Sequence, residues 1–271
     1  MESVSVTVAG VERRYLLARA GSDAHRPVVV FLHGTGGTAA WADGETGWSA
    51  FAGRAGFTLA IPEGLPPDSA RPPKFLTNPQ RWTEGPEDVE FLAAVIADVL
   101  DQTDGDPRRV YLSGFSNGAA MAFRFATERS DLLAAVAPVA GYCRVADPRP
   151  SRPVPTLYVI GTADPLVPLH GGQVRLPWGG RVVRRGPVVE SLEAWASALG
   201  CAPVPEVVSD TGGVREEVYP GPVEYRAVFV EGLGHHWPGG KGQLNPRIGG
   251  QPSNKLNANE LIWGFFSRHV L

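Results

Sequence analysis

Cysteine is scarce in this chain of 271 residues. The two cysteines, Cys143 and Cys201, lie far apart, and neither belongs to a Cys-x-x-Cys pair. A zinc knuckle is therefore excluded. Two buried thiols are the interpretation that we favour. A single disulfide is the alternative and would require an oxidising compartment, and a nucleophilic cysteine is the weakest hypothesis of the three.

Long apolar runs are also missing. The longest, residues 132–140, contains Pro138 and is far shorter than the roughly 20 residues that a membrane span needs. The first ten residues have neither the basic start nor the apolar stretch of a signal peptide. We expect no membrane span, and either a secreted protein whose signal is absent from this sequence or a cytoplasmic one.

The chain has no excess of basic residues. It carries 25 Lys and Arg against 28 Asp and Glu, a net charge of −3. Nucleic-acid-binding domains normally show a basic excess, so we expect no nucleic-acid partner. Hydrophobic residues at 43% and charged residues at 20% are ordinary for a globular protein. The length predicts one domain over residues 1–271, with no room for a large lid domain. We expect a monomer or a small homo-oligomer.

Short apolar strands alternate with amphipathic helices along the chain. This order predicts an α/β fold with a mainly parallel central sheet and helices on both faces. An edge hairpin is expected at residues 4–18, and an inserted hairpin or flap at residues 171–186. Strands are predicted at residues 28–32, 57–61, 109–113, 134–140, 156–160, 214–219 and 225–230. Helices are predicted at residues 49–55, 88–100, 117–127, 188–199 and 253–270, the last with Ser253 as its N-cap.

The strongest chemical signal is Gly114-Phe115-Ser116-Asn117-Gly118, between a predicted strand and a predicted helix. This is the context of a nucleophile elbow. The sharp turn needs glycine on both sides of the serine, where a Cβ atom would clash. The alternative is an ordinary strand–helix turn with glycine at a cap. We favour Ser116 as a nucleophile.

A serine nucleophile needs a base that an acid holds in place. In α/β-hydrolases the order along the chain is Ser, Asp or Glu, His. His235 and His236 follow a late predicted strand, where the base belongs, whereas His170 suits the mouth of the site and His269 a surface or capping position.

Asp164 is the candidate acid, because it follows the strand predicted at residues 156–160 and can reach a histidine Nδ1. Its alternative role is an Asx turn before Pro165. Asp147 lies in a proline-rich loop and Asp210 precedes two glycines, so turn roles suit both better.

The oxyanion hole should use the amide of Asn117 and a second amide from the loop at residues 33–37. This loop is rich in glycine, but it lacks the Lys-Ser/Thr of a P-loop and a full Gly-x-Gly-x-x-Gly. Nucleotide binding is therefore disfavoured. His33 is expected to shape the loop through hydrogen bonds.

Five motifs recur in order along the chain. They are Phe31-Leu32-His33-Gly34, Arg109-Val110-Tyr111, Gly114-Phe115-Ser116-Asn117-Gly118-Ala119, Gly161-Thr162-Ala163-Asp164-Pro165-Leu166-Val167-Pro168 and Gly234-His235-His236-Trp237-Pro238-Gly239. Together they resemble the polyhydroxybutyrate-depolymerase and feruloyl-esterase branch of the α/β-hydrolases (carbohydrate esterase family 1-like). The resemblance spans nearly the whole chain, and Gly-His-x-Trp-Pro-Gly is its most specific element.

The resemblance implies an α/β-hydrolase fold. It maps the base to His235, leaves His236 at a variable position, and maps the second oxyanion amide to Thr35. Many members of this group are secreted. Members often have a cysteine at the position of Cys201, and Cys143 is its candidate partner in a disulfide.

The hypothesis for function is a serine carboxylester hydrolase that acts on short-acyl, hydroxycinnamoyl or polyester-type esters. Ser116, His235 and Asp164 would be its catalytic residues, and no metal or organic cofactor is expected. The substrate could be polymeric, as a plant cell-wall ester or a polyester. A serine peptidase or thioesterase on the same fold is the alternative, and a non-catalytic binding module is less favoured.

Substrate contacts are predicted from loops near the carboxyl ends of the strands. Trp82, Trp178 and Trp237 could hold a sugar, a phenolic acyl group or an aromatic polyester unit, or could pack at the rim. We also assign His236 to substrate binding. A basic cluster is either a solvated face, which we favour, or a contact for an acidic polymer or carboxylate product. Its members are Arg181, Arg184 and Arg185.

Overall fold

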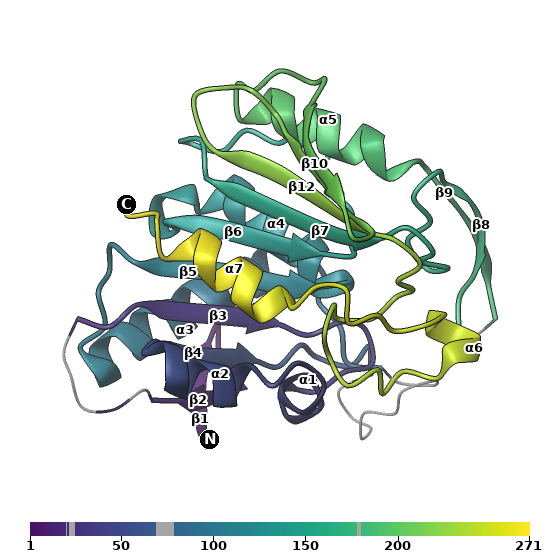
Figure 1. Ribbon diagram of the computed structural model, residues 1–271. Helices are drawn as coiled ribbons and strands as arrows, with labels where there is room; N and C mark the ends of the chain where they lie inside the picture. Colours follow the sequence, from purple (N-terminus) through teal and green to yellow (C-terminus); the bar gives the residue numbers. More distant parts are fainter. Residues whose placement is uncertain (20, 22–24, 69–78, 178–179) are drawn as a thin grey trace.

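The computed structural model describes residues 1–19, 21, 25–68, 79–177 and 180–271. Ten strands of this described part form one sheet (Figure 1). In spatial order they are β1 (Glu2–Val8), β2 (Val11–Ala18), β4 (Thr58–Pro62), β3 (Val28–Leu32), β5 (Val110–Phe115), β6 (Ala135–Val139), β7 (Thr156–Gly161), β12 (Tyr225–Val230), β11 (Val214–Val218) and β10 (Glu206–Thr211).

The centre of the sheet is parallel, and its two ends are antiparallel. Parallel pairing runs from β4 through β3, β5, β6 and β7 to β12. The β1–β2 hairpin closes one edge and β11–β10 the other. The predicted mainly parallel sheet and the edge hairpin are confirmed. β10 was not predicted, because its residues are largely exposed and carry no buried apolar run.

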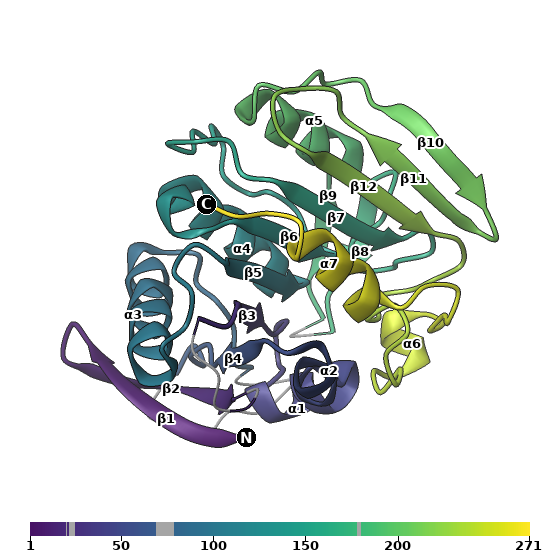
Figure 2. The same cartoon turned by 60° about the vertical axis from the view of Figure 1, so that its left-hand side comes forward.

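Helices cover both faces of this sheet, as Figure 2 shows. One face packs against α3 (Pro86–Thr103), α4 (Asn117–Glu128) and α5 (Val188–Ala198), and the other against α1 (Ala39–Thr46), α2 (Trp48–Ala55) and α7 (Ala258–Phe266). The short helix α6 (Pro246–Gly249) and a 3-10 turn (Ser130–Leu132) complete the helical segments of the described part. These layers are those of the α/β-hydrolase fold.

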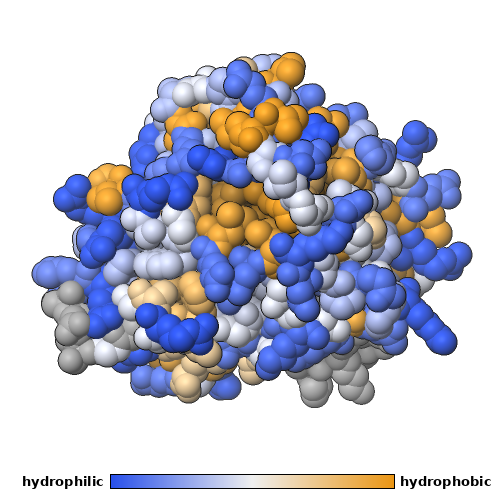
Figure 3. All heavy atoms as spheres, viewed as in Figure 1, coloured by the Kyte–Doolittle hydropathy of each residue, from blue (hydrophilic) through white to orange (hydrophobic). Residues whose placement is uncertain are grey.

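The alternation of side chains along β3 explains why its apolar run has no polar positions. Val28, Val30 and Leu32 pack with the α3–α5 layer, whereas Val29 and Phe31 pack with the α1, α2 and α7 layer. A strand buried on both faces is apolar at most positions. The face of the molecule drawn in Figure 3 is mostly polar, and apolar side chains gather there in a hollow between α7 and β12.

The last helix differs from its prediction. It spans Ala258–Phe266 instead of residues 253–270, and its N-cap is Asn257, not Ser253. The Asn257 side chain accepts hydrogen bonds from the backbone N–H groups of Asn259 and Glu260, which is the geometry that an N-cap provides. No helix of the described residues is both long and apolar enough for a membrane span.

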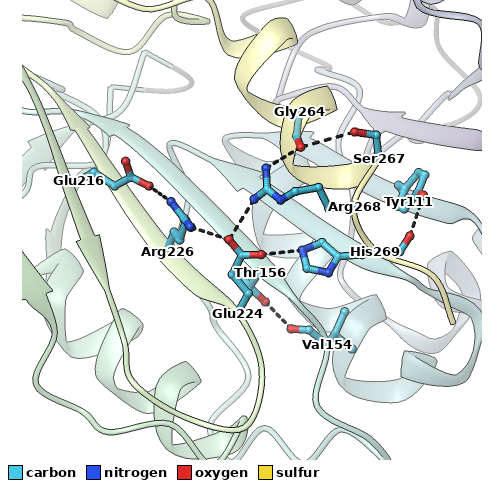
Figure 4. Close-up of polar contacts among 10 residues, drawn as sticks. All are labelled: Tyr111, Val154, Thr156, Glu216, Glu224, Arg226, Gly264, Ser267, Arg268 and His269. Atoms are coloured by element: carbon cyan, nitrogen blue, oxygen red, sulfur yellow. Dashed lines mark hydrogen bonds and ion pairs between the residues drawn. The ribbon is translucent and has the colours of Figure 1, made fainter. Parts of the chain in front are cut away.

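Polar contacts fasten the chain after α7 to the sheet (Figure 4). Glu224, which precedes β12, pairs with Arg226 at 2.6 Å, Arg268 at 2.9 Å and His269 at 3.0 Å. The Tyr111 hydroxyl donates a hydrogen bond to the His269 carbonyl at 2.8 Å. His269 is therefore a half-buried residue beyond the helix that contacts the Glu224 carboxylate, rather than a free surface residue.

Figure 1 also shows what lies at the carboxyl edge of the sheet. The parallel strands point toward the side of the molecule where α6 and a separate two-stranded hairpin lie. That hairpin pairs β8 (Gly172–Arg175) with β9 (Val182–Arg185) in antiparallel fashion. The predicted insertion at residues 171–186 is thus a hairpin, and it borders the edge where the candidate chemical residues emerge.

Candidate active site

Ser116 lies in a strained turn between β5 and α4. Its backbone has φ 58° and ψ −114°, a conformation that L-residues rarely adopt. A Cβ atom on Gly114 would lie 2.3 Å from the Gly118 carbonyl oxygen, and one on Gly118 would lie 2.3 Å from the Leu32 carbonyl oxygen. The glycines of the motif are therefore required by close backbone packing, as the sequence predicts for a nucleophile elbow.

Three side chains from distant parts of the chain meet at this turn. Ser116 Oγ lies 2.8 Å from His235 Nε2, and His235 Nδ1 lies 2.7 Å from Asp164 Oδ2. His235 and Asp164 are both 3% exposed, whereas Ser116 is half-buried and open to two cavities. In this order the hydroxyl can donate to Nε2 while Nδ1–H donates to the carboxylate, so a proton can move from the serine to a held imidazole.

The carboxylate of Asp164 is fixed on its other side. Its Oδ1 accepts hydrogen bonds from the backbone N–H groups of Leu166 at 2.8 Å and Val167 at 2.7 Å. The Asx-type turn and the contact with His235 are therefore compatible, since Oδ1 of Asp164 forms the turn and Oδ2 contacts His235. Two amide donors keep the buried carboxylate satisfied and aim Oδ2 at the imidazole.

His33 shapes the glycine loop, as predicted. Its Nδ1 donates to the Gly34 carbonyl at 2.8 Å, and its Nε2 accepts from the Gly64 N–H at 2.9 Å. Burial lowers the pKa of His33 to about 4, so the ring is neutral at pH 7. A neutral ring with one donor and one acceptor matches both bonds and locks the loop.

Two backbone N–H groups beside Ser116 are free to bind a ligand. In the loop after β3, Gly36 N–H donates to the Gln80 carbonyl and Gly37 N–H to the Gly34 carbonyl. Among the described residues, the N–H groups of Thr35 and Asn117 have no such partner. Both residues line the space around Ser116, and the N–H of Asn117 lies at the N-terminus of α4, where the helix dipole favours negative charge.

The side chain of Asn117 holds a neighbouring loop in place. Its Oδ1 accepts from the Trp82 N–H at 2.7 Å, and its Nδ2 donates to the Trp82 carbonyl at 3.2 Å and to Glu84 Oε1 at 2.9 Å. Glu84 Oε1 also receives Arg144 Nη1 at 2.7 Å. Burial is the main influence on Glu84 and raises its pKa, although Arg144 opposes that shift.

Two cavities meet at Ser116, and both include Thr35 and Leu166. The narrow cavity, about 40 Å³, is walled by the apolar side chains of Trp41, Phe115, Leu244 and Ile248. The wide cavity, about 410 Å³, is the more polar of the two. Its polar and aromatic lining comes from Arg81, Trp82, Glu84, Tyr142, Arg144, Arg181 and Arg185.

Sequence reasoning missed most of this lining. Leu244 lies just before α6 and Ile248 lies within it. The glycine and proline content of this segment predicts neither a helix nor a strand. Tyr142 and Arg144 follow β6, the strand next to β5. The signal available for these two was their position after a core strand, since parallel strands all end at one edge.

The predicted aromatic rim is wrong in part. Trp237 is 2% exposed, packs against Phe31 and donates from Nε1 to Asn259 Oδ1 at 2.8 Å, so it belongs to the core. His236 is also 2% exposed; its Nε2 lies 3.0 Å from the Gly250 carbonyl, and it lines neither cavity. Both residues were assigned to substrate binding because a loop position does not reveal burial.

The other two tryptophans have different outcomes. Trp82 borders the wide cavity but is 2% exposed, and its Nε1 donates to the His33 carbonyl at 2.9 Å. It therefore supports the loop more than it offers a ring to solvent. Trp178 lies outside the described residues.

The two cysteines are both free, with Cys201 buried and Cys143 half-buried. This contradicts the alternative of a disulfide between them.

The remaining acid and base candidates lie elsewhere. His170 and Asp210 border a separate cavity beside α5 and β10. Asp147 forms an exposed pair with Arg149. Of the predicted residues, the structure thus brings together Ser116 and Asp164 with His235.

The layered sheet and the contacts at its carboxyl edge place this protein in the α/β-hydrolase class. The family described as "Esterase PHB depolymerase" matches residues 14–145. "Putative esterase NocK" of Nocardia uniformis subsp. tsuyamanensis is 33% identical, over 96% of this chain and 80% of its own length. The chain belongs to this PHB depolymerase esterase family, and it is a carboxylic ester hydrolase.

Two further comparisons extend this result. Feruloyl esterase B of Piromyces equi is 30% identical over 60% of this chain, and the match covers 32% of that enzyme. The acetyl xylan esterase from Aspergillus awamori shares the fold, with a TM-score of 0.66 over 98% of this chain and 100% of that one, at 13% identity.

Proposed function

We propose that Ser116, His235 and Asp164 form the catalytic triad of this esterase. The observation that carries the proposal is the continuous path from Ser116 Oγ through both nitrogens of His235 to Asp164, with contacts of 2.8 and 2.7 Å. Hydrogen-bond reach between nucleophile, base and orienting acid is the geometry that activates a serine. We also propose that residues 1–271 form one domain.

In the first half of the reaction, Ser116 Oγ attacks the ester carbonyl carbon while its proton passes to His235 Nε2. Asp164 stabilises the imidazolium through Nδ1–H. The free N–H groups of Thr35 and Asn117 bind the developing oxyanion. Collapse of the tetrahedral intermediate breaks the bond to the leaving oxygen, which takes the proton from His235 Nε2 and departs as the alcohol.

In the second half, water attacks the acyl-enzyme. His235 takes one proton of the water, the remaining hydroxyl adds to the acyl carbon, and the proton returns to Ser116 as the acid product leaves. One water is consumed, and one acid and one alcohol are released. These steps need only groups that the chain itself supplies.

The two cavities suggest how an ester lies across Ser116. A water molecule needs roughly 10–15 Å³ of such space, so the narrow cavity of about 40 Å³ suits a short apolar group. The wide cavity is about ten times larger and takes the other part of the substrate. We propose a short-acyl ester first, with hydroxycinnamoyl and polyester-type esters, which the names of the relatives suggest, as candidates to compare.

Turnover of p-nitrophenyl esters of increasing chain length, in the wild type and in Ser116→Ala, tests this proposal. We expect short esters to react fastest and Ser116→Ala to lose several orders of magnitude in kcat without loss of folding. His236→Ala is the matched control for His235→Ala, since the two side chains are adjacent and only His235 contacts Ser116. Near wild-type activity in Ser116→Ala would refute the triad, and activity on peptides or thioesters but not on oxygen esters would favour the alternative chemistry.

A further inference from the structure

The wide cavity beside Ser116 has an unusual charge balance. Four arginines line it, namely Arg81, Arg144, Arg181 and Arg185, against the single carboxylate of Glu84. The Arg144–Glu84 pair, at 2.7 Å, neutralises one of them. The chain as a whole has a net charge of −3, so this local positive charge does not follow from the composition.

Three of these cations have no counterion among the residues that the structure describes. Within the described ranges, no carboxylate forms an ion pair with Arg81, Arg181 or Arg185. Arg81 and Arg181 are exposed and Arg185 is half-buried, and all three line the cavity beside Ser116. The three guanidinium groups therefore leave a positive field over the space that a substrate must enter.

Arg185 is the most enclosed of the three. It is half-buried on β9, its guanidinium lies 5.8 Å from the centre of the Tyr142 ring, and its Nε is buried with no hydrogen-bond partner among the described residues. Burial, and after it the charge of Arg144, lowers the pKa of Arg185. A partly desolvated cation next to another cation gains more from a bound anion than a fully solvated one does.

From these contacts we infer that the wide cavity selects esters that carry a carboxylate on the part of the substrate it holds, through Arg181 and Arg185. This rests on the proposed function. The planar guanidinium matches the two oxygens of a carboxylate, and an uncharged substrate would leave these cations unpaired. The carboxylate takes no part in the bond changes at Ser116 and leaves with its half of the product.

The β8–β9 hairpin supplies a matched control. Arg184 lies between the two selected arginines in sequence, carries the same charge and is exposed, but it does not line the cavity. Arg184→Gln and Arg185→Gln therefore change the net charge of the protein equally. Only the second removes a cation from the cavity.

The test compares charged and neutral esters of matched size. On the acyl side, mono-p-nitrophenyl adipate is compared with p-nitrophenyl hexanoate; on the alcohol side, 4-(butyryloxy)benzoate with phenyl butyrate. We expect the wild type to prefer the charged member of at least one pair in kcat/KM by about tenfold or more, the effect of a hydrogen bond to a charged group. Arg185→Gln and Arg181→Gln should lose most of this ratio, while Arg184→Gln keeps it.

The outcomes separate this inference from the proposed function. If neutral esters react normally and neither pair shows a preference for the charged member, the inference is overturned and the esterase proposal stands. An equal loss of preference in Arg184→Gln and Arg185→Gln also overturns it, because the effect would then come from surface charge at long range. If no ester reacts and Ser116 resists a fluorophosphonate, both proposals fall.

Discussion

Replacing Gly118 with alanine should unfold this protein at a markedly lower temperature. The added Cβ would lie 2.3 Å from the Leu32 carbonyl oxygen and 2.7 Å from that of His33. Ordinary carbon contacts lie at about 3.5–4.0 Å, so α4 and β3 would have to separate by roughly 1 Å. Both obstructing atoms are backbone atoms of a core strand and the loop that follows it, and neither can rotate away.

The cost can be estimated from known overpacking effects. Inserting a methyl group into a packed core costs about 1–3 kcal/mol and sometimes more. Because the contact here is with backbone, we expect a loss of about 3 kcal/mol or more. At about 2–4 °C per kcal/mol for a protein of this size, the Tm should fall by about 6–12 °C. Ser116 should also shift, so esterase activity should fall with the Tm.

Gly264→Ala provides the opposite case. Gly264 is an exposed residue in the last turn of α7 (Figure 4), and a Cβ added there meets nothing within 4 Å. Glycine in an exposed helix interior costs about 0.5–1 kcal/mol relative to alanine, so this variant should melt about 1–4 °C higher. Thermal unfolding followed by circular dichroism measures the Tm of the Gly118→Ala and Gly264→Ala variants. A Gly118→Ala protein that melts within about 2 °C of the wild type, with full activity, would refute the steric argument.

Three further predictions follow from the site and its surroundings. Asp164→Asn should keep its hydrogen bonds to the backbone but disfavour the required His235 tautomer, so kcat should fall by about 10⁴-fold; a loss below tenfold would contradict the triad. His33 has a pKa of about 4 in the fold against about 6.5 when unfolded, so the unfolded chain binds the proton first. About 3 kcal/mol of stability should therefore be lost as the pH falls from 6.5 to 4. Denaturant unfolding at both pH values measures this loss, and an equally steep loss in His33→Gln would refute the assignment to His33. Cys143 and Cys201 are free, so the denatured protein without reductant should give two reactive thiols with Ellman's reagent. A count of no reactive thiols would indicate a disulfide. In the folded state the reaction at Cys143 should be slow, since burial raises the pKa of its thiol to about 11.

Elements with strong local signals were predictable. The strands β3, β5 and β7 each contain at least three consecutive apolar residues, because both faces of a central parallel strand are buried. The elements that were missed have weaker signals. Helix α1 begins just after a glycine-rich loop, at the N-cap Thr38, and β10 is held mainly by its pairing with β11.

The sequence by itself determined the sharp turn at Ser116, the nucleophile that we propose. Gly114, Ser116 and Gly118 lie within five consecutive residues, and their chemistry depends on a local backbone conformation. Asp164 and His235 could be chosen because each follows a strand in a parallel sheet, whose carboxyl ends share one edge. The order of the elements was enough to place both residues at that edge.

Only the tertiary structure decided which neighbouring side chains line the cavities beside Ser116. His236 adjoins His235 in sequence but is buried against the Gly250 carbonyl, and Arg184 adjoins Arg185 but lies outside the cavity. Neighbouring residues in a loop or strand can point to opposite sides, and burial depends on what other segments cover them. The two cavities likewise combine segments that are remote in sequence, so no local pattern could reveal them.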